Sequence, residues 1–136
     1  MLRFLTICTL TLLPAFAQAQ VIRENNIVVR VAPLTATTFE VFDGLDFHPR
    51  SAYCGAAIYA KRKYGTDGGD IWLARGLGPS ETIPGRRSVV FSLDPVPNEF
   101  KSVSLSLRKA GQVTSFALAN SFCYNTEFRV RVREVR

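Results

Sequence analysis

Two cysteines limit the fold of this chain more than any other feature of its sequence. Of the three cysteines among 136 residues, Cys8 lies in an apolar N-terminal segment, while Cys54 and Cys123 lie far apart in the remainder. A pair of cysteines in an oxidising compartment most simply forms one disulfide, which we expect between Cys54 and Cys123. The bond would close a loop of 70 residues, counted inclusively, and contribute about 4 kcal/mol through loop entropy. The alternative is two unrelated buried thiols.

Residues 1–19 predict a cleaved signal peptide. Arg3 precedes an apolar run over residues 4–13, and the small-x-small triplet 17–19 is typical of a cleavage site. The run has about ten residues, too few to span a bilayer at 1.5 Å per residue. We therefore expect an exported chain that begins at Gln20, keeps 16 of the 17 basic residues and all 11 acidic ones, and has a net charge of +5. The short segment resembles Gram-negative bacterial signals, which implies a periplasmic or secreted protein.

The remaining residues, 20–136, suffice for one folded domain. The chain is 47% hydrophobic and 21% charged, which is typical of a compact fold rather than a disordered segment. No stretch reaches the roughly 18 apolar residues of a membrane-spanning helix. Since no internal repeat or low-complexity segment divides the chain, we expect a single exported domain.

One helix is predicted over residues 52–64. Ser51 is a good N-cap, and Gly65 is typical of a helix end. Alanines and Cys54 cover one broad arc, which indicates close packing against a sheet, although Lys61 falls within the same arc. The residues expected on the opposite side are Gly55, Tyr59, Arg62 and Lys63.

Strands are predicted wherever β-branched and aromatic residues cluster or alternate with polar ones. The clearest alternation is that of residues 101–108, with 113–119 as its hairpin partner. The order of elements favours an α+β fold, an antiparallel sheet of about six or seven strands with one α-helix packed on a face; a β-sandwich with one helix is the alternative. The other expected strands are 27–31, 38–42, 71–74, 88–93 and 128–136.

Candidate catalytic residues are scarce. His48 is the single histidine, and the expected disulfide would remove Cys54 as the nucleophile of a thiol enzyme. The spacings of cysteine and acidic residues match neither a zinc nor a calcium site, and the glycines form no phosphate-binding motif. We therefore expect no catalytic residue, metal or cofactor. A small hydrolase or inhibitor-like function would lie in the long connection 76–87.

Clustered arginines are the feature with the clearest functional meaning. Arg129, Arg131 and Arg133 alternate in the expected terminal strand and would stand about 6.8 Å apart on one face. With Arg86 and Arg87, they predict a non-enzymatic domain that binds an anionic envelope component or an acidic partner protein. No aromatic residue interleaves the row, so we expect no specific nucleic acid. The alternatives are charges that only protect a strand edge, and an accessory subunit that adds its edge strand to a partner sheet.

Three short motifs carry a resemblance to a known family. They are the run 53–57 (Tyr-Cys-Gly-Ala-Ala), the turn 84–87 (Pro-Gly-Arg-Arg) and the triplet 121–123 (Ser-Phe-Cys). Together with the signal peptide they resemble a family of small uncharacterised exported proteins of alphaproteobacterial type, over most of residues 27–124. The resemblance implies an exported domain with two cysteines and carries over no activity and no catalytic residue.

Overall fold

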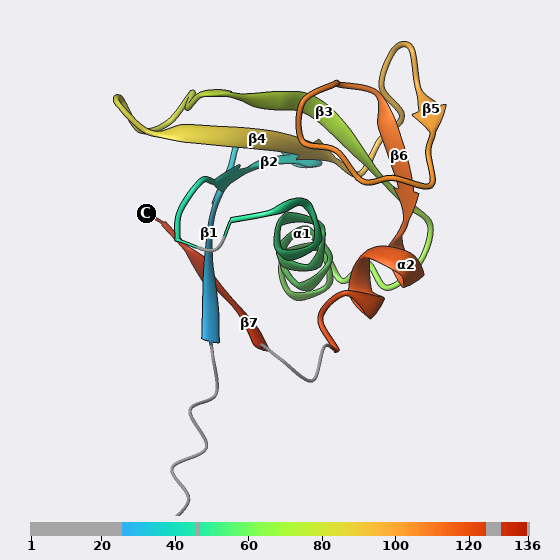
Figure 1. The fold of residues 1–136 in the computed structure, drawn as a ribbon, viewed down its shortest axis with the longest axis horizontal. Helices are drawn as coiled ribbons and strands as arrows, with labels where there is room; N and C mark the ends of the chain where they lie inside the picture. The colour runs from blue at the N-terminus through green and yellow to red at the C-terminus, as the bar shows by residue number, and fades with distance from the viewer. Residues whose placement is uncertain (1–25, 46, 125–128, 136) are drawn as a thin grey trace, which may run out of the picture.

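The computed structural model describes residues 26–45, 47–124 and 129–135. The signal peptide expected at 1–19 lies outside them. Seven strands and two helices form an α+β fold in this part of the chain (Figure 1). The elements in chain order are β1 (Asn26–Pro33), β2 (Thr38–Phe42), α1 (Pro49–Tyr64), β3 (Asp70–Pro79), β4 (Arg87–Ser92), β5 (Phe100–Lys101), β6 (Gln112–Ser115), α2 (Phe116–Ser121) and β7 (Arg129–Glu134).

The seven strands form one sheet that curls around α1 (Figure 1). Their order is β5-β6-β3-β4-β2-β1-β7, and a single sheet excludes the β-sandwich alternative. Most neighbours are antiparallel as expected, but β1 pairs with β7 and β5 with β6 in parallel. The sheet is therefore mixed. β7 runs parallel to β1 because the chain returns from α2 to the end of the sheet where β1 begins (Figure 1).

α1 is buried over more of its circumference than its sequence predicts. Gly55 and Tyr59, expected on the outer side, are buried, while Lys61 is exposed. The curled sheet contacts α1 through β1, β2 and β7, and α2 covers a further side. A Cβ atom on Gly55 would lie 2.6 Å from Cγ1 of Val29, so the contact with β1 requires glycine.

Aromatic side chains fill the space between α1 and the sheet. Tyr59 lies 4.9 Å from Phe39 of β2, and Tyr53 lies 4.9 Å from Phe91 of β4, both measured between ring centroids. All four rings are buried. Such tilted and edge-to-face contacts stabilise a core beyond the area they bury, and Phe39 and Phe91 both belong to this core.

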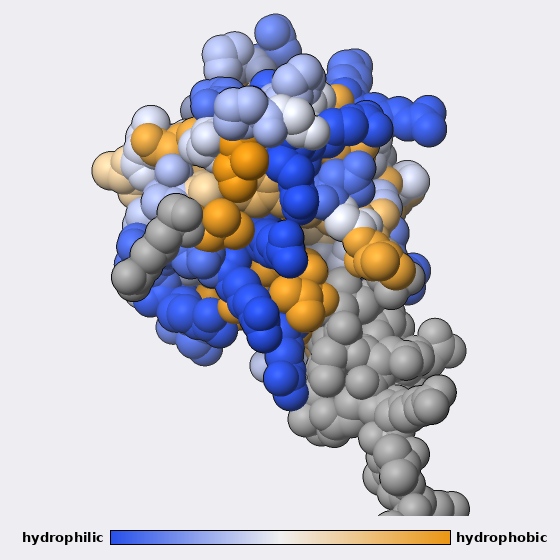
Figure 2. Space-filling view, turned by 90° about the vertical axis from the view of Figure 1, so that its left-hand side faces the viewer, coloured by the Kyte–Doolittle hydropathy of each residue, from blue (hydrophilic) through white to orange (hydrophobic). Residues whose placement is uncertain are grey.

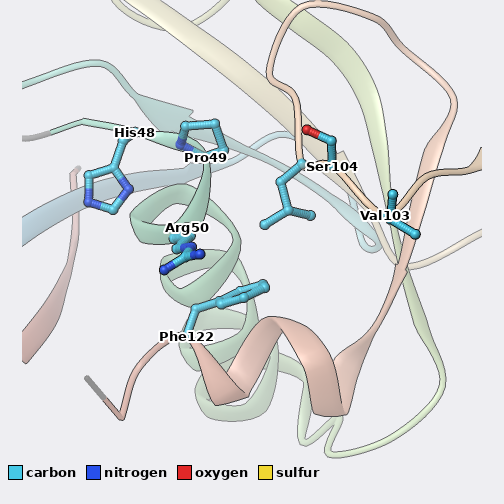
Figure 3. Close-up of a pocket in the computed structure, with 7 residues that line it drawn as sticks. His48, Pro49, Arg50, Val103, Ser104 and Phe122 are labelled. Atoms are coloured by element: carbon cyan, nitrogen blue, oxygen red, sulfur yellow. The ribbon is translucent and has the colours of Figure 1, made fainter. Parts of the chain in front are cut away.

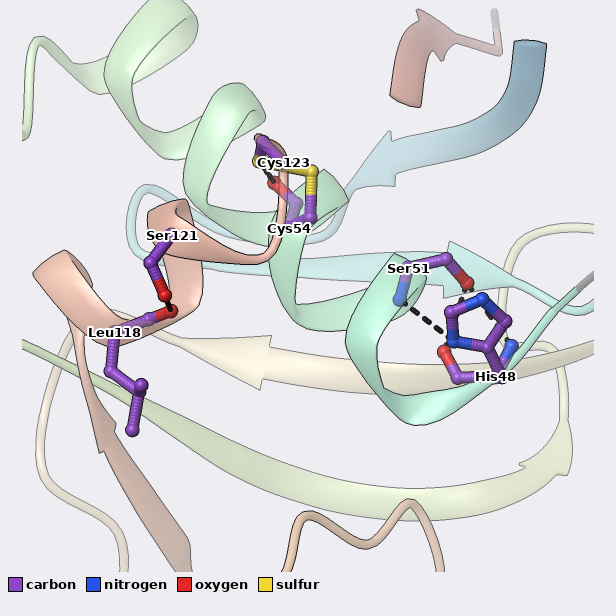
Figure 4. The surroundings of a disulfide bond; sticks show 6 residues. All are labelled: His48, Ser51, Cys54, Leu118, Ser121 and Cys123. Carbon is purple, nitrogen blue, oxygen red and sulfur yellow. Dashed lines mark hydrogen bonds between the residues drawn. A yellow bond between two sulfur atoms is a disulfide. The ribbon is translucent and has the colours of Figure 1, made fainter. Parts of the chain in front are cut away.

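The start of α1 differs from the prediction. The N-cap is His48 rather than Ser51, and Pro49 is the first helical residue. His48 Nδ1 accepts a hydrogen bond from the Ser51 N–H at 3.2 Å, and Ser51 Oγ accepts one from the His48 N–H at 3.0 Å (Figure 4). This reciprocal pair does the work of a Ser/Glu capping box, and proline suits the first turn because it has no N–H to satisfy. At the other end, Gly65 ends the helix with φ 69°, as expected.

Cys54 and Cys123 form the expected disulfide (Figure 4). Their Cα atoms lie 5.2 Å apart, and Cys54 is buried in α1. Because only the C-cap residue Phe122 separates Cys123 from α2, the bond fixes the end of α2 against α1.

The segment 101–108 is not the strand that its alternation predicts. Only Phe100 and Lys101 pair with β6, and the chain then follows an irregular path. The buried Gln112 explains this path: its amide accepts from the Ser106 N–H and donates to the Ser104 carbonyl, both at 2.9 Å. A side chain thus supplies the hydrogen bonds that a neighbouring strand would otherwise provide.

The expected strand 113–119 ends after β6 and continues as α2. Ser115 caps this short helix, since its Oγ accepts a hydrogen bond from the Leu118 N–H at 3.2 Å. The prediction of a hairpin strand therefore overlooked a helix start in residues 115–119 (Ser-Phe-Ala-Leu-Ala).

β3 is longer than predicted and takes up part of the expected loop 76–87. It runs to Pro79, with register shifts against β4 on either side of Arg75. Gly76 passes so close to the Arg108 carbonyl that a Cβ atom would clash with it. This approach lets the Leu77 N–H donate to the Leu107 carbonyl at 2.7 Å. The connection to β4 is therefore a short turn over residues 80–86.

Candidate anion-binding face

The parallel pairing of β1 and β7 brings three arginines together. Arg30 lies in register with Arg133, and Val28 with Arg131. Side chains alternate along a strand, and the intervening Val29 and Val132 are buried against α1. Arg30, Arg131 and Arg133 consequently project from the outer face of the sheet, where all three are exposed. We call this set the arginine face.

The described part of the chain places no counter-charge on the arginine face. Among the described residues, no carboxylate lies within 4.0 Å of Arg30, Arg131 or Arg133. Adjacent strands are only about 4.8 Å apart and alternate residues about 6.8 Å, and like charges at such positions repel. Figure 2 looks onto this side of the molecule, where hydrophilic side chains cover much of the surface with apolar ones between them. Val28, which lies in register with Arg131, is 42% exposed.

Only some of the predicted site residues lie close together in the structure. Arg131 and Arg133 lie together as expected. Arg86 and Arg87 lie at the turn between β3 and β4, exposed but separated from β1 by strand β2. Arg129 begins β7, and its side chain lies outside the described part of the structure.

Sequence reasoning missed Arg30. Its place depends on the long-range pairing of β1 with β7, which no local pattern reveals. The available signal was the alternation Val29-Arg30-Val31 in an expected strand, which places one cation on the side opposite two valines.

The acidic residue of β7 faces the other way. Glu134 lies on the α1 side, where it accepts a hydrogen bond from the Tyr59 hydroxyl at 3.0 Å and pairs with Lys63 at 3.3 Å. Burial, together with this carboxylate, raises the pKa of Tyr59. Glu134 is therefore committed to α1 and does not neutralise the arginine face.

The free edge of β7 is partly covered by α1. The Val135 N–H donates to the Val31 carbonyl of β1 at 2.7 Å. Backbone groups of successive residues point to opposite sides of a strand, so those of Val132, three residues before Val135, point away from β1. Arg62 donates to the Val132 carbonyl at 3.1 Å and thereby occupies a central acceptor of the free edge.

A second polar cluster lies on the outer face, at Glu40 of β2. Its side chain is fully buried. It accepts hydrogen bonds from the hydroxyls of Ser80 (3.0 Å), Thr82 (2.5 Å) and Ser88 (2.7 Å), from the Glu81 N–H (2.7 Å) and from the Arg75 guanidinium (3.4 Å).

These donors determine both the charge and the role of Glu40. Burial alone raises the pKa of a carboxyl group, but here the hydrogen bonds outweigh burial and lower the pKa of Glu40. A carboxylate whose two oxygens already accept five hydrogen bonds has little capacity to take a proton from a substrate. Glu40 therefore ties the turn over residues 80–86 to the sheet.

Glu40 also went unnoticed in the sequence, although a charged residue stands out in the apolar strand Phe39–Phe42. The turn expected to hold a hydrolase- or inhibitor-like function instead folds its own polar groups onto this carboxylate. Arg75 adds a contact to Glu81 at 3.6 Å on the exposed side.

Within residues 26–45, 47–124 and 129–135, no group of three or more His, Cys, Asp or Glu side chains could hold a metal ion. None of the helices within the described ranges is long and apolar enough to cross a membrane.

Comparison with protein-family models, with curated proteins and with solved structures found no match. The resemblance to a family of exported two-cysteine proteins therefore stays a prediction, and functional inference depends on the geometry of the chain itself.

Proposed function

We propose that the protein is an exported, non-enzymatic domain that binds a phosphate-rich anionic surface of the cell envelope through the arginine face. The observation that supports it best is the adjacency of Arg30, Arg131 and Arg133 on one exposed face, where none of the carboxylates that the structure describes pairs with them. Charged side chains that repel each other weaken the fold slightly, and an anionic ligand would relieve that repulsion.

Guanidinium groups suit this role. Each presents a planar fork of donors that can bind a phosphate through two parallel hydrogen bonds. A basic residue near an anionic lipid surface contributes about 1 kcal/mol, so three arginines would change affinity roughly a hundredfold. The exposed Val28 beside Arg131 offers an apolar contact that an acidic protein or a free polyanion would use less well.

The export part of the proposal is supported by the disulfide. Stable disulfides are rare in reducing compartments and common in exported proteins. Purification of the native protein tests this directly. We expect an N-terminus at Gln20 and a mass that rises by two alkyl groups only when reductant precedes alkylation. A native chain that begins at Met1, or has both thiols free, would contradict export.

Vesicle sedimentation tests the binding proposal. The mature domain should bind phosphatidylcholine vesicles that contain phosphatidylglycerol and not vesicles of phosphatidylcholine alone. Binding should fall steeply as salt rises, because exposed charges are screened. Replacing all three residues of the arginine face by glutamine should reduce binding roughly a hundredfold.

A matched control separates position from net charge. Lys101, Arg108 and Lys109 are exposed at β5 and in the segment that follows, at the opposite edge of the sheet from β7. Their replacement by glutamine removes the same charge and should leave most binding intact. Equal loss in both triple variants would show a net-charge effect, and unchanged binding in the first would refute the arginine face.

Strand addition is a second candidate because β7 is an edge strand of the sheet. The contact of Arg62 with the Val132 carbonyl argues against it, since an added strand would have to displace this guanidinium. Association by strand addition would persist at high salt, in contrast to binding through the arginine face.

A further inference from the structure

A cleft lies between the first turn of α1 and the irregular segment after β5. Its volume is about 440 Å³, and Phe122 closes one side (Figure 3). The volume lies within the range of roughly 300–1,000 Å³ that is usual for small-molecule sites. The cleft is separate from the arginine face, which is carried by β1 and β7.

Both walls of the cleft are held in place by contacts outside it. Phe122 precedes Cys123, whose disulfide to Cys54 anchors it to α1. On the opposite wall, the Ser104 carbonyl accepts a hydrogen bond from Gln112 at 2.9 Å. A site whose walls are positioned in advance loses less entropy when a ligand binds.

The cleft combines one cation with apolar walls. The Arg50 guanidinium lies over the Phe122 ring, 5.8 Å from its centroid, and no described carboxylate lies within 4.0 Å of it. Val103 is as exposed as a residue can be, at 108% of its reference area, and Leu105 is partly buried beside it. Among the lining residues that the structure describes, none is acidic.

Val103 contributes no burial energy to the fold. A fully exposed apolar side chain gains nothing from burial in the folded state, and here it stands next to a hollow lined by Leu105 and Phe122. A ligand with a hydrocarbon body would remove this surface from water, and an anionic end would pair with Arg50.

We propose that this cleft binds a small monocarboxylate with an apolar body, its carboxylate on Arg50 and its hydrocarbon part against Val103, Leu105 and Phe122. One guanidinium matches one carboxylate as a bidentate pair. A phosphate ester or a polyanion would require further cations, and Arg50 is the one Lys or Arg side chain among the described lining residues. The inference is independent of the anionic surface proposed above.

Titration of the ¹⁵N-labelled mature domain tests this site with 3-phenylpropionate and its neutral amide, which have the same shape. We expect saturable amide shifts at Arg50, at residues 103–105 and at Phe122. The carboxylate should bind about tenfold more tightly than the amide, as expected for a hydrogen bond to a charged group.

Three variants assign the contacts. Arg50→Gln should abolish the preference for the carboxylate, and Val103→Ser should weaken both compounds, whereas Arg131→Gln on the arginine face should behave as wild type. Arg50 and Val103 are exposed, so both variants should keep the dispersed spectrum of the folded protein. The proposal is overturned by equal binding of carboxylate and amide, by an unchanged preference in Arg50→Gln, by the same loss in Arg131→Gln, or by no saturable shift at the solubility limit.

Discussion

The outer face of the sheet holds arginines in two contrasting environments. Arg75 of β3 reaches a fully buried carboxylate, Glu40, at 3.4 Å and also bonds to Ser88. Arg30 and Arg133, on strands β1 and β7, lie side by side in water with no carboxylate close by among the described residues. Arginine on one surface thus pairs with a buried carboxylate in the first environment and with none of the described carboxylates in the second.

The contrast separates stabilising charges from charges that the fold does not need. A buried carboxylate loses its hydration, so every donor around it must be present for the native state to be stable. Exposed arginines keep their hydration in the folded and unfolded chain alike, and they add little or nothing to stability. Selection for stability therefore explains Arg75 and Glu40, while the arginine face calls for another explanation, such as a ligand or protection of the edge.

The largest expected effect is that of Glu40→Gln. This substitution removes the charge opposite Arg75 and replaces one acceptor oxygen by a donor that faces Ser80 and Thr82. Breaking a buried ion pair from one side costs about 3–5 kcal/mol, and because Arg75 is 30% exposed we expect about 3 kcal/mol. Urea unfolding at neutral pH measures the loss.

Glu81→Gln is the matched control for this variant. Glu81 also contacts Arg75, at 3.6 Å, but its side chain is 57% exposed, so the loss should stay below about 0.5 kcal/mol. A loss of less than about 1 kcal/mol in Glu40→Gln would mean that the Arg75–Glu40 cluster stabilises the protein no more than the exposed arginine face does.

Acidification should selectively weaken the interactions of Glu40 with Arg75 and its other hydrogen-bond donors. Since the pKa of Glu40 is lower in the folded than in the unfolded state, its contribution is complete above the unfolded value of 4.5 and is lost as pH falls through the folded value. The difference in unfolding free energy between wild type and Glu40→Gln should therefore shrink below that pH. Thermal unfolding of both proteins from neutral pH to pH 3 measures it, and a constant difference would contradict a charged Glu40.

Local sequence patterns sufficed for the elements that depend on local chemistry. The cysteine pair predicted the disulfide, Gly65 predicted the end of α1, and the terminal alternation predicted β7. In each case, the residues that decide the outcome lie within the element or follow from compartment chemistry.

The features that the sequence did not predict depend on residues far away in the chain. The alternation of Val103, Leu105 and Leu107 is typical of a strand, yet Gln112 satisfies this backbone from its own side chain. Glu40 resembled an ordinary exposed strand residue until the turn over residues 80–86 covered it, and Arg30 joined the arginine face only through parallel pairing. Neither the covering turn nor the partner strand is encoded near the residue that it affects.

Arg62→Ala tests an environment between these two extremes. Arg62 is exposed but donates to the Val132 carbonyl at the free edge of β7. We expect a loss of about 1 kcal/mol and, at high concentration, self-association through the uncovered edge. Chemical unfolding and analytical ultracentrifugation measure these, with Lys61→Ala, an exposed neighbour on the same helix, as control. Equal behaviour of the two variants would show that the Arg62 contact does not protect the edge.

The smallest expected effect has the opposite sign. Arg133→Gln removes one of two cations that face each other across β1 and β7, so it should raise the unfolding free energy by about 0.3 kcal/mol at low salt. The gain should vanish at high salt, where the repulsion is screened. A double-mutant cycle with Arg30→Gln isolates the pair, because each single variant relieves the same repulsion and the two gains should not add. Additive gains would show that Arg30 and Arg133 do not repel each other. A loss of stability in Arg133→Gln would mean that Arg133 contributes to folding as Arg75 does, and the distinction between the two environments would fail.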